Sequence, residues 1–322
     1  MSKRNWALVA ATLVSIIYGV TFTIAKDVMP NYVEPFGFIS LRVGGSVLLF
    51  WAVSFFGRLF LPKFRDHNDK IALEDFPRIV AAALFGVALN MLTFFKGLSY
   101  TSPIMGAVLM VTTPMIVLIL SAIIMKERMQ KRKVFGIILG LAGTITLILY
   151  GKSMVNAPNA TLGNLLVFIN AISYGFYLIL VKKLMDKYNA FTFVKWIYTF
   201  GFLMVLPFGW SEFNAVNWTE IPTDIFWKIG FVVVFSTFLT YLLNLVSMRE
   251  LKPTTVAVFI YLQPLFATIF AVSLGKDELS WVKLLSAILI FTGVYLVTQK
   301  RVRSRSKQSH QKLKTETETE NF

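Results

Sequence analysis

The chain has 322 residues, of which 56% are hydrophobic and only 15% are charged. A soluble domain is closer to a quarter charged, so this composition excludes an ordinary soluble protein and indicates a polytopic helical membrane protein. The formal net charge of +15 could indicate that the protein binds nucleic acid. However, the basic residues lie mostly between the apolar blocks, which is typical of a basic membrane protein. Cysteine is absent, which excludes disulfides, thiolate chemistry and cysteine-ligated metals.

Ten apolar segments follow one another along the chain, and each has close to the roughly 20 residues that cross a bilayer. The first follows basic residues, as a signal peptide would, but no small-residue cleavage site comes after it, so we expect it to be retained. Residues 301–322 are basic and then rich in Thr and Glu, which predicts a disordered cytoplasmic tail. The predicted spans are residues 6–25, 36–57, 78–96, 103–125, 134–151, 162–181, 191–210, 226–247, 254–275 and 281–299.

Lysine and arginine are distributed unevenly between the connecting segments. If the N-terminus is cytoplasmic, most of them fall in cytoplasmic segments, the tail included, and few fall in external ones. Cytoplasmic segments carry the excess of basic residues in membrane proteins. We therefore predict a multi-pass protein of the cell (inner) membrane with both termini in the cytoplasm.

The fourth and fifth predicted spans have a second copy 150 residues later. Each copy is an apolar helix interrupted by one proline, then a short charged turn, then an apolar helix with glycine. Matched positions are Pro103 and Pro253, Pro114 and Pro264, Lys126 and Lys276, Gly143 and Gly293. This indicates an internal repeat. Each half has five spans, an odd number, so the second half enters the membrane from the opposite side, as in many secondary transporters. The predicted fold is all-α, with ten transmembrane helices as two inverted five-helix repeats.

The first helices of the two halves also match, at a shift of 156, in the pairs Tyr18-Gly19 and Tyr174-Gly175, which are followed by Lys26 and Lys182. With the proline-centred fourth helix that ends in an acidic residue, this pattern resembles the drug/metabolite transporter superfamily, specifically the ten-helix exporters with two EamA domains. The resemblance covers about residues 6–299 and makes residues 1–151 and 152–300 the two EamA-like halves. Many members of the superfamily carry Trp where this sequence has Tyr18. Arg42 fits the family's second-helix arginine, whereas the equivalent position in the seventh helix is Tyr198.

The resemblance implies a secondary transporter that exports a small organic metabolite, with amino acids or related solutes favoured, by alternating access. A carrier for drug-like or sugar-type solutes is the nearest alternative, and a passive channel is disfavoured by the paired prolines. Expected partners are the small-molecule substrate and the lipid bilayer, and not nucleic acid. Gly136, Gly140 and Gly143 form a small-residue face that predicts packing within the chain, with a homodimer contact as the weaker alternative.

Polar side chains inside the spans are expensive unless they face protein or water. Polar residues at helical spacing therefore indicate either a substrate cavity or hydrogen bonds between packed helices. For the sixth and eighth helices we favour the cavity. The candidate substrate-binding residues are Tyr18, Asn90, Asn170, Tyr174, Tyr177, Tyr241, Asn244 and Gln263.

Several charged residues and prolines also lie inside the predicted spans. Arg42 lies about 10 Å into the second span, where it either attracts an anionic group of the substrate or snorkels to the outer interface. Lys195 and Lys228 lie near span ends, which predicts snorkelling. Pro114 and Pro264 each remove a helical hydrogen bond, and their equivalent places predict hinges or local backbone openings.

Residues for enzymatic chemistry are missing from the predicted spans. The only histidines, His67 and His310, lie outside them, and no carboxylate falls inside one. The sequence contains no Walker A motif, no HExxH and no glycine-rich phosphate loop. We therefore predict that the protein is not an enzyme and needs no cofactor and no metal.

Overall fold

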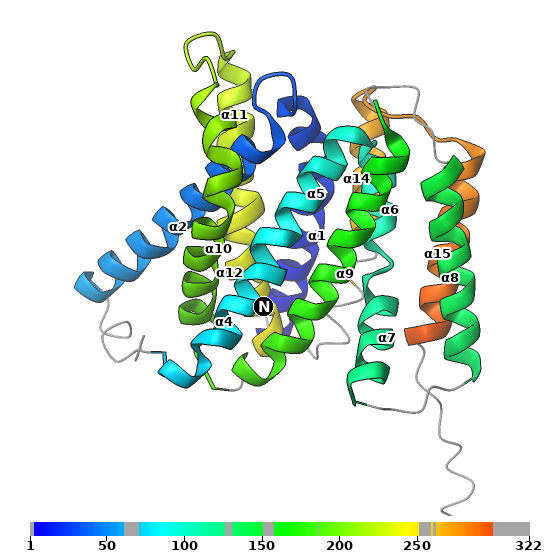
Figure 1. Ribbon diagram of the computed structural model, residues 1–322, viewed down its shortest axis with the longest axis horizontal. Coiled ribbons are helices and arrows are strands. Elements are labelled where there is room, and N and C mark those ends of the chain that lie inside the picture. The colour runs from blue at the N-terminus through cyan, green and yellow to red at the C-terminus, as the bar shows by residue number, and fades with distance from the viewer. Residues whose placement is uncertain are drawn as a thin grey trace, which may run out of the picture.

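The computed structural model describes residues 3–60, 71–125, 131–150, 158–185, 187–250, 259 and 262–298, and every regular element in these ranges is helical (Figure 1). The predicted tail, residues 301–322, lies outside them. The first half contains α1 (Lys3–Val28), α2 (Pro35–Phe60), η1 (Leu73–Asp75), α4 (Phe76–Ala83), η2 (Leu84–Ala88), α5 (Leu89–Tyr100), α6 (Pro103–Met110), α7 (Thr113–Met125) and α8 (Lys131–Tyr150). The second half contains α9 (Ala160–Met185), α10 (Ala190–Asn214), α11 (Thr223–Phe231), η3 (Val232–Leu239), α12 (Thr240–Glu250), α14 (Leu262–Ser273) and α15 (Trp281–Thr298).

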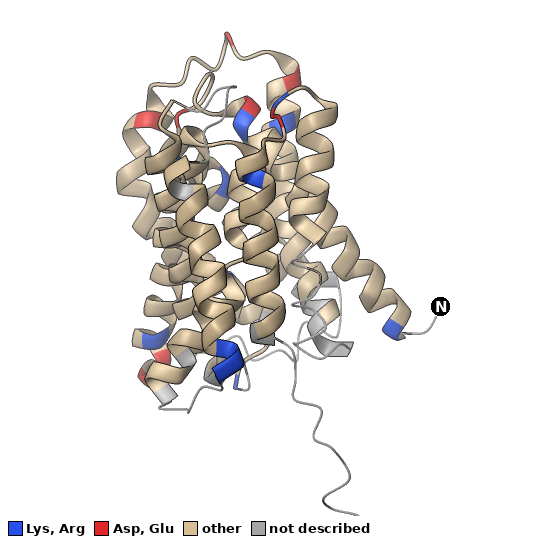
Figure 2. Cartoon of the chain, turned by 90° about the vertical axis from the view of Figure 1, so that its right-hand side faces the viewer, with Lys and Arg blue, Asp and Glu red and all other residues tan. Residues whose placement is uncertain are grey.

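Among the residues that the structure describes, seven helical stretches are long and apolar enough to cross a membrane, and two shorter apolar helices follow them. Lys, Arg, Asp and Glu gather toward the two ends of the helices, with uncharged residues between (Figure 2). Large apolar side chains such as Ile138 and Ile288 are exposed on the outer faces of α8 and α15, where lipid would cover them. The protein is therefore a helical, multi-pass membrane protein. The beginning of the predicted ninth span lies outside the described residues, so the count of ten stays a prediction.

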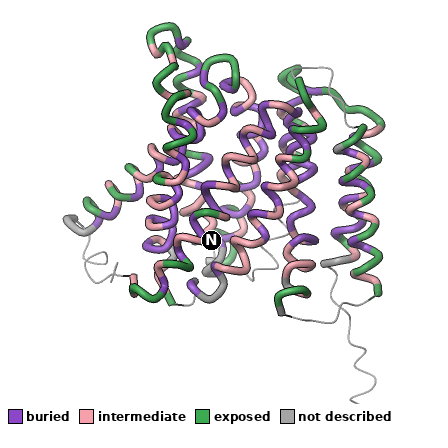
Figure 3. Tube along the Cα trace, in the orientation of Figure 1, coloured by how far each residue is buried: buried purple, intermediate pink, exposed green. Residues whose placement is uncertain are grey.

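The helices pack in pairs that join the two halves. The most extensive contacts are between α8 and α15, α2 and α10, and α5 and α9, and α1 packs against α14 and α12. In Figure 1, α8 and α15 lie side by side at the right. Buried residues face the interior of these pairs and exposed ones lie on outer faces and connections (Figure 3). The pairing places the core between the halves rather than within each of them.

Glycines at matched positions allow two of these close contacts. A Cβ on Gly19 of α1 would lie 2.5 Å from Cβ of Phe266 on α14. A Cβ on Gly175 of α9 would lie 3.0 Å from a side-chain carbon of Ile116 on α7. Gly19 and Gly175 are equivalent at the 156 shift, and Ile116 and Phe266 at the 150 shift. The same helix contact is therefore formed twice, each time between a helix of one half and a helix of the other.

The predicted small-residue face of α8 packs within the chain. A Cβ on Gly143 would lie 2.8 Å from Cβ of Leu289, and one on Gly293 would lie 2.5 Å from the carbonyl oxygen of Gly136. Such spacing lets two helix backbones approach closely. The face that the sequence singled out is thus occupied by α15.

The predicted fourth span is broken immediately before Pro114. α6 ends at Met110 and α7 begins at Thr113, with a turn between them. Proline has no N–H, so the carbonyl four residues earlier, that of Met110, loses its helical partner. The Thr113 hydroxyl donates to this carbonyl at 2.8 Å. The break is therefore locally satisfied. Pro264 is buried in the first turn of α14 as described, and most of the residues before it lie outside the described ranges.

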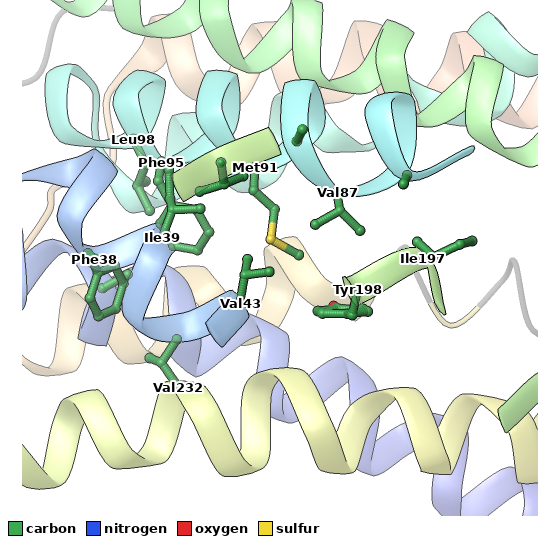
Figure 4. Packing of buried hydrophobic residues seen from close by; sticks show 14 of the residues in the cluster. Phe38, Ile39, Val43, Val87, Met91, Phe95, Leu98, Ile197, Tyr198 and Val232 are labelled. Carbon is green, nitrogen blue, oxygen red and sulfur yellow. The ribbon is translucent and has the colours of Figure 1, made fainter. Parts of the chain in front are cut away.

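The third helix of each half contains a π-helical segment. η2 covers Leu84–Ala88 and η3 covers Val232–Leu239, and the 150 shift places the first inside the second. A π-segment widens the helix and weakens its regular hydrogen bonding, and such segments are frequent at functional sites. Figure 4 shows core residues around these segments, among them Val43 of α2, Val87 of η2, Met91 and Phe95 of α5, and Val232 of η3.

Candidate functional site

Arg42 projects from α2 onto the π-segment η3. Its side chain is buried, with 6% of the residue exposed. Nε donates to the Thr237 hydroxyl at 2.6 Å and Nη2 donates to the Ser236 carbonyl at 3.3 Å. The Thr237 hydroxyl in turn donates to the carbonyl of Val232, five residues earlier, at 2.9 Å. Arg42 therefore reaches inward, and of the two alternatives left open by the sequence, snorkelling to the outer interface is wrong.

The guanidinium of Arg42 also lies over an aromatic ring. Its central carbon is 4.8 Å from the centre of the Phe95 ring on α5. Attraction between a cation and the face of a ring stabilises a charged group that has left water. Arg42 thus contacts α5 and η3 from α2, which ties together elements of both halves.

The other π-segment, η2, is bound by neutral side chains from α9. The Ser173 hydroxyl donates to the Phe85 carbonyl at 2.7 Å. One turn further, the Asn170 amide donates to the carbonyl of Asn90 at 2.8 Å, and the Asn90 amide donates back to the carbonyl of Asn170 at 3.4 Å. Asn90 and Asn170 therefore join α5 to α9 by hydrogen bonds, which is the packing alternative for these two candidates.

Four predicted tyrosines lie together with a fifth that the sequence did not single out for the site. The rings of Tyr174 and Tyr177 on α9 are stacked, with centres 5.6 Å apart. The ring of Tyr241 on α12 meets that of Tyr198 on α10 edge to face at 5.0 Å. The Tyr18 hydroxyl on α1 accepts from the Thr240 hydroxyl at 3.3 Å. We call these five residues the tyrosine cluster.

The tyrosine cluster is held deep in the protein between helices of both halves. Tyr18 and Tyr241 lie within electrostatic range of each other, and Tyr18 also lies within that range of the two α9 tyrosines. Tyr198 is fully buried, whereas the other four retain partial solvent accessibility. Arg42 lies within electrostatic range of Tyr18, Tyr198 and Tyr241. The structure thus brings together four predicted tyrosines and Arg42.

Two candidates are not drawn into this cluster by any described contact. Asn244 on α12 and Gln263 on α14 are half-buried, and neither forms a side-chain hydrogen bond within the described ranges. Both positions stay predictions.

The two lysines predicted to snorkel are held by protein groups instead. Lys195 is 2% exposed, and its ammonium lies 3.2 Å from the Ser54 hydroxyl and 4.5 Å from the centre of the Trp51 ring. Lys228 forms ion pairs with Asp27 at 3.0 Å and with Asp224 at 3.2 Å. Distance from a helix end did not reveal these partners, because they come from other segments or from the preceding helical turn.

Charged residues form ion pairs at the connections between helices. The buried Asp277 carboxylate pairs with Lys283 at 2.5 Å and accepts from the backbone N–H of Ile104, in the first turn of α6. At a different connection, Lys187 pairs with Asp75 at 2.6 Å and with Glu74 at 2.9 Å. These two carboxylates raise the pKa of the half-exposed Lys187 ammonium above its usual range. Such contacts fix the connections between helices.

Within the described part of the chain, no group of three or more His, Cys, Asp or Glu side chains is placed to hold a metal ion.

Two comparisons with known proteins agree on the kind of molecule. The model of the EamA-like transporter family matches residues 5–149 and 161–299. An uncharacterized transporter of Archaeoglobus fulgidus is 25% identical over 298 residues, which cover 92% of this chain and 100% of the relative. The uncharacterized transporter YetK of Bacillus subtilis is 24% identical over 225 residues, 69% of this chain and 68% of the relative.

A solved structure described only as the crystal structure of a protein has a similar fold. Its TM-score is 0.59 at 17% identity, and the match covers 92% of this chain and 98% of that one. At this identity the likeness concerns the fold alone.

Proposed function

Because the chain belongs to the EamA-like transporter family, we propose that it is a secondary transporter that exports a small organic metabolite by alternating access. Amino acids and related solutes are the favoured cargo, with drug-like or sugar-type solutes as the alternative. The relatives support membrane transport, since they too are described as transporters. The substrate and the direction are our proposal.

The observation that carries this proposal is the tyrosine cluster. Its members come from α1 in the first half and from α9, α10 and α12 in the second, so it lies where the halves meet. Substrate sites of transporters built from inverted repeats lie at that interface. Tyr18, Tyr174, Tyr177 and Tyr241 would offer hydroxyls and ring faces to a solute, and their partial accessibility leaves room for contact.

The ten-helix, inverted arrangement belongs to the same proposal. Two halves related by a twofold axis should repeat their contacts in exchanged form, and the matched glycine contacts of Gly19 and Gly175 support this. Halves at residues 1–151 and 152–300, with both termini cytoplasmic in the cell membrane, fit the basic residues of the connecting segments. The break before Pro114 is a candidate hinge, and Pro264 is its equivalent.

A screen in liposomes tests the proposal. The purified full-length protein is reconstituted in vesicles loaded with a metabolite mixture, and the released solutes are identified by mass spectrometry. We expect saturable release of a small set of solutes. Release of all small solutes with ohmic single-channel currents in planar bilayers would instead establish a channel, and no release beyond empty vesicles would overturn transport.

Variants then test the site. Tyr174→Ala and Asn244→Ala should reduce transport far more than they reduce folded protein in the membrane. Tyr150→Ala is the matched control, because Tyr150 is exposed at the end of α8, away from the tyrosine cluster. If transport falls only in proportion to folded yield, both residues serve packing and the site assignment fails.

A further inference from the structure

Arg42 is a buried charge that has no countercharge among the described residues. It lies in α2 about 10 Å from the start of the helix and is 6% exposed. Across the ranges described by the structure, no carboxylate forms an ion pair with it. An unpaired charge in a membrane interior is costly and is a functional site by default. Its three described contacts, with Thr237, Ser236 and Phe95, are with neutral groups.

The Arg42 guanidinium is held in place by η3 and still has N–H groups that can donate to a ligand. Arginine has five N–H donors. Nε and Nη2 are held by η3, whereas Nη1 has no acceptor among the described residues. The polar groups of η3 therefore orient the guanidinium without neutralising it, because a hydroxyl and a carbonyl carry no net charge.

A second donor without an acceptor lies close by. The Tyr198 hydroxyl is buried and forms no hydrogen bond of normal geometry within the described segments, although the Tyr241 hydroxyl lies near enough to interact with it. Its ring contacts the ring of Tyr241, and both hydroxyls lie within electrostatic range of Arg42. Tyr18 completes the set around the charge. A buried hydroxyl without a partner loses free energy that a suitable ligand would restore.

From these contacts we infer that Arg42 binds the carboxylate of the transported solute, with the hydroxyls of Tyr198 and Tyr241 beside it. This inference rests on the proposed transport function and names its substrate class: small molecules with one carboxylate, either simple monoanions or zwitterions. A carboxylate accepts two parallel hydrogen bonds from a guanidinium, and charge-assisted bonds of this kind are about twice as strong as neutral ones. One arginine among neutral tyrosines balances one negative charge, which fits a monocarboxylate better than a phosphate group. A cationic solute without a carboxylate would be repelled.

Binding to the detergent-purified full-length protein tests this. The probes are the twenty amino acids and a set of aryl and alkyl monocarboxylates, each paired with its carboxamide, and binding is measured by titration calorimetry with sodium chloride at fixed concentration. We expect at least one carboxylate to bind at least about tenfold more tightly than its amide, the effect of a lost charged hydrogen bond. If no carboxylate in the panel exceeds its amide in the wild-type protein, the inference is overturned without any variant.

Two variants locate the effect. Arg42→Gln should abolish the preference for carboxylate over amide, and Arg42→Lys should keep part of it, because charge remains and the planar fork is lost. Lys96→Gln removes a different positive charge, one that lies over the rings of Phe36 and Tyr100, and should leave the preference unchanged. An unchanged preference in folded Arg42→Gln would place the carboxylate elsewhere and overturn the inference. If Arg42→Gln does not fold, Arg42→Lys decides: wild-type preference and affinity in that variant would also overturn it.

The transport screen separates this inference from the proposed function. Arg42-dependent carboxylate binding in a protein that releases no solute from vesicles would support the carboxylate site and contradict the transport function. Release of carboxylates and their amides at the same rate would support the transport function and contradict the carboxylate site.

Discussion

The two π-segments have the same place in the repeat but bind different chemical groups. In η2, the Phe85 carbonyl accepts from the neutral Ser173 hydroxyl. In η3, the Ser236 carbonyl accepts from the charged guanidinium of Arg42. Both donors come from the opposite half of the chain. The same backbone irregularity therefore receives a cross-half contact twice, and only one of the two contacts carries charge.

The difference indicates how an internal repeat becomes a polar site. Two identical halves would present the same groups on both sides of the solute. Here the α9 side of the interface offers stacked rings of Tyr174 and Tyr177, and the α2 side offers Arg42. On the proposed function, an elongated solute with one charged end would fit such a pair of surfaces in one orientation.

The largest expected effect is steric and belongs to η2. A Cβ on Gly86 would lie 2.3 Å from the Tyr177 ring, so Gly86→Ala should force that ring to move. We expect a loss of about 3 kcal/mol in stability, at the upper end for overpacking, and a loss of transport. Thermal unfolding in detergent and vesicle efflux measure both. The matched change in η3, Ser236→Ala, removes a buried hydroxyl oxygen without a described partner and should be nearly neutral; equal damage from the two changes would contradict the comparison.

The next effect compares the hydrogen bonds themselves. Thr237→Val removes the acceptor of Arg42 Nε and should cost about 2 kcal/mol, the scale of a bond to a charged group. Ser173→Ala removes a neutral bond to the Phe85 carbonyl and should cost about 1 kcal/mol. Chemical denaturation of the two variants gives both values. A larger loss for Ser173→Ala would show that the charge on Arg42 is already balanced by another group.

A smaller effect is expected at the hydrogen bonds beside η2. Asn90→Ala and Asn170→Ala should each cost about 0.6 kcal/mol, the average for such bonds between membrane helices, with transport per folded molecule unchanged. Each amide donates to a backbone carbonyl on the other helix, and neither contact needs a substrate. Efflux normalised to folded protein is the measurement. A selective loss of transport would return these two residues to the substrate site.

Much of this arrangement could be predicted from the sequence because repetition carries spatial information. The 150 and 156 shifts identified equivalent helices, and the glycines at those positions lie in equivalent contacts. The break in the fourth helix was also predictable, since Pro114 cannot donate a backbone hydrogen bond. Polar spacing on the sixth helix selected Tyr174 and Tyr177, which the structure stacks together. Their role as substrate contacts stays a prediction.

Other features depend on tertiary contacts that no local pattern reveals. Neither π-segment contains proline, and each has a backbone carbonyl that accepts from a side chain of the other half, Ser173 or Arg42. Tyr198 was noted only as the equivalent of Arg42. Equivalent residues near a twofold axis approach each other, and here these two lie within electrostatic range. The polar stripe on the sixth helix also mixed two roles, because Asn170 bonds to α5 while Tyr174, one turn later, lies in the tyrosine cluster.

The last prediction concerns pH: we expect neither the pH nor a pH gradient to affect transport near neutrality. A carrier driven by protons needs a group that gains and loses charge near neutral pH in the substrate path, usually Asp, Glu or His. Around η3 the described polar groups include the guanidinium of Arg42 and the hydroxyls of Tyr18, Tyr198 and Tyr241, and arginine and tyrosine side chains do not ordinarily change charge near neutral pH. A carboxylate solute also stays ionised near neutral pH.

Transport with the same pH on both sides of the vesicle should therefore be constant from about pH 6 to 8, and a pH step across the vesicle at clamped voltage should drive no accumulation. Accumulation that collapses with the pH gradient would contradict this and would point to a titrating group away from η3, with the buried Lys195 as the first to substitute.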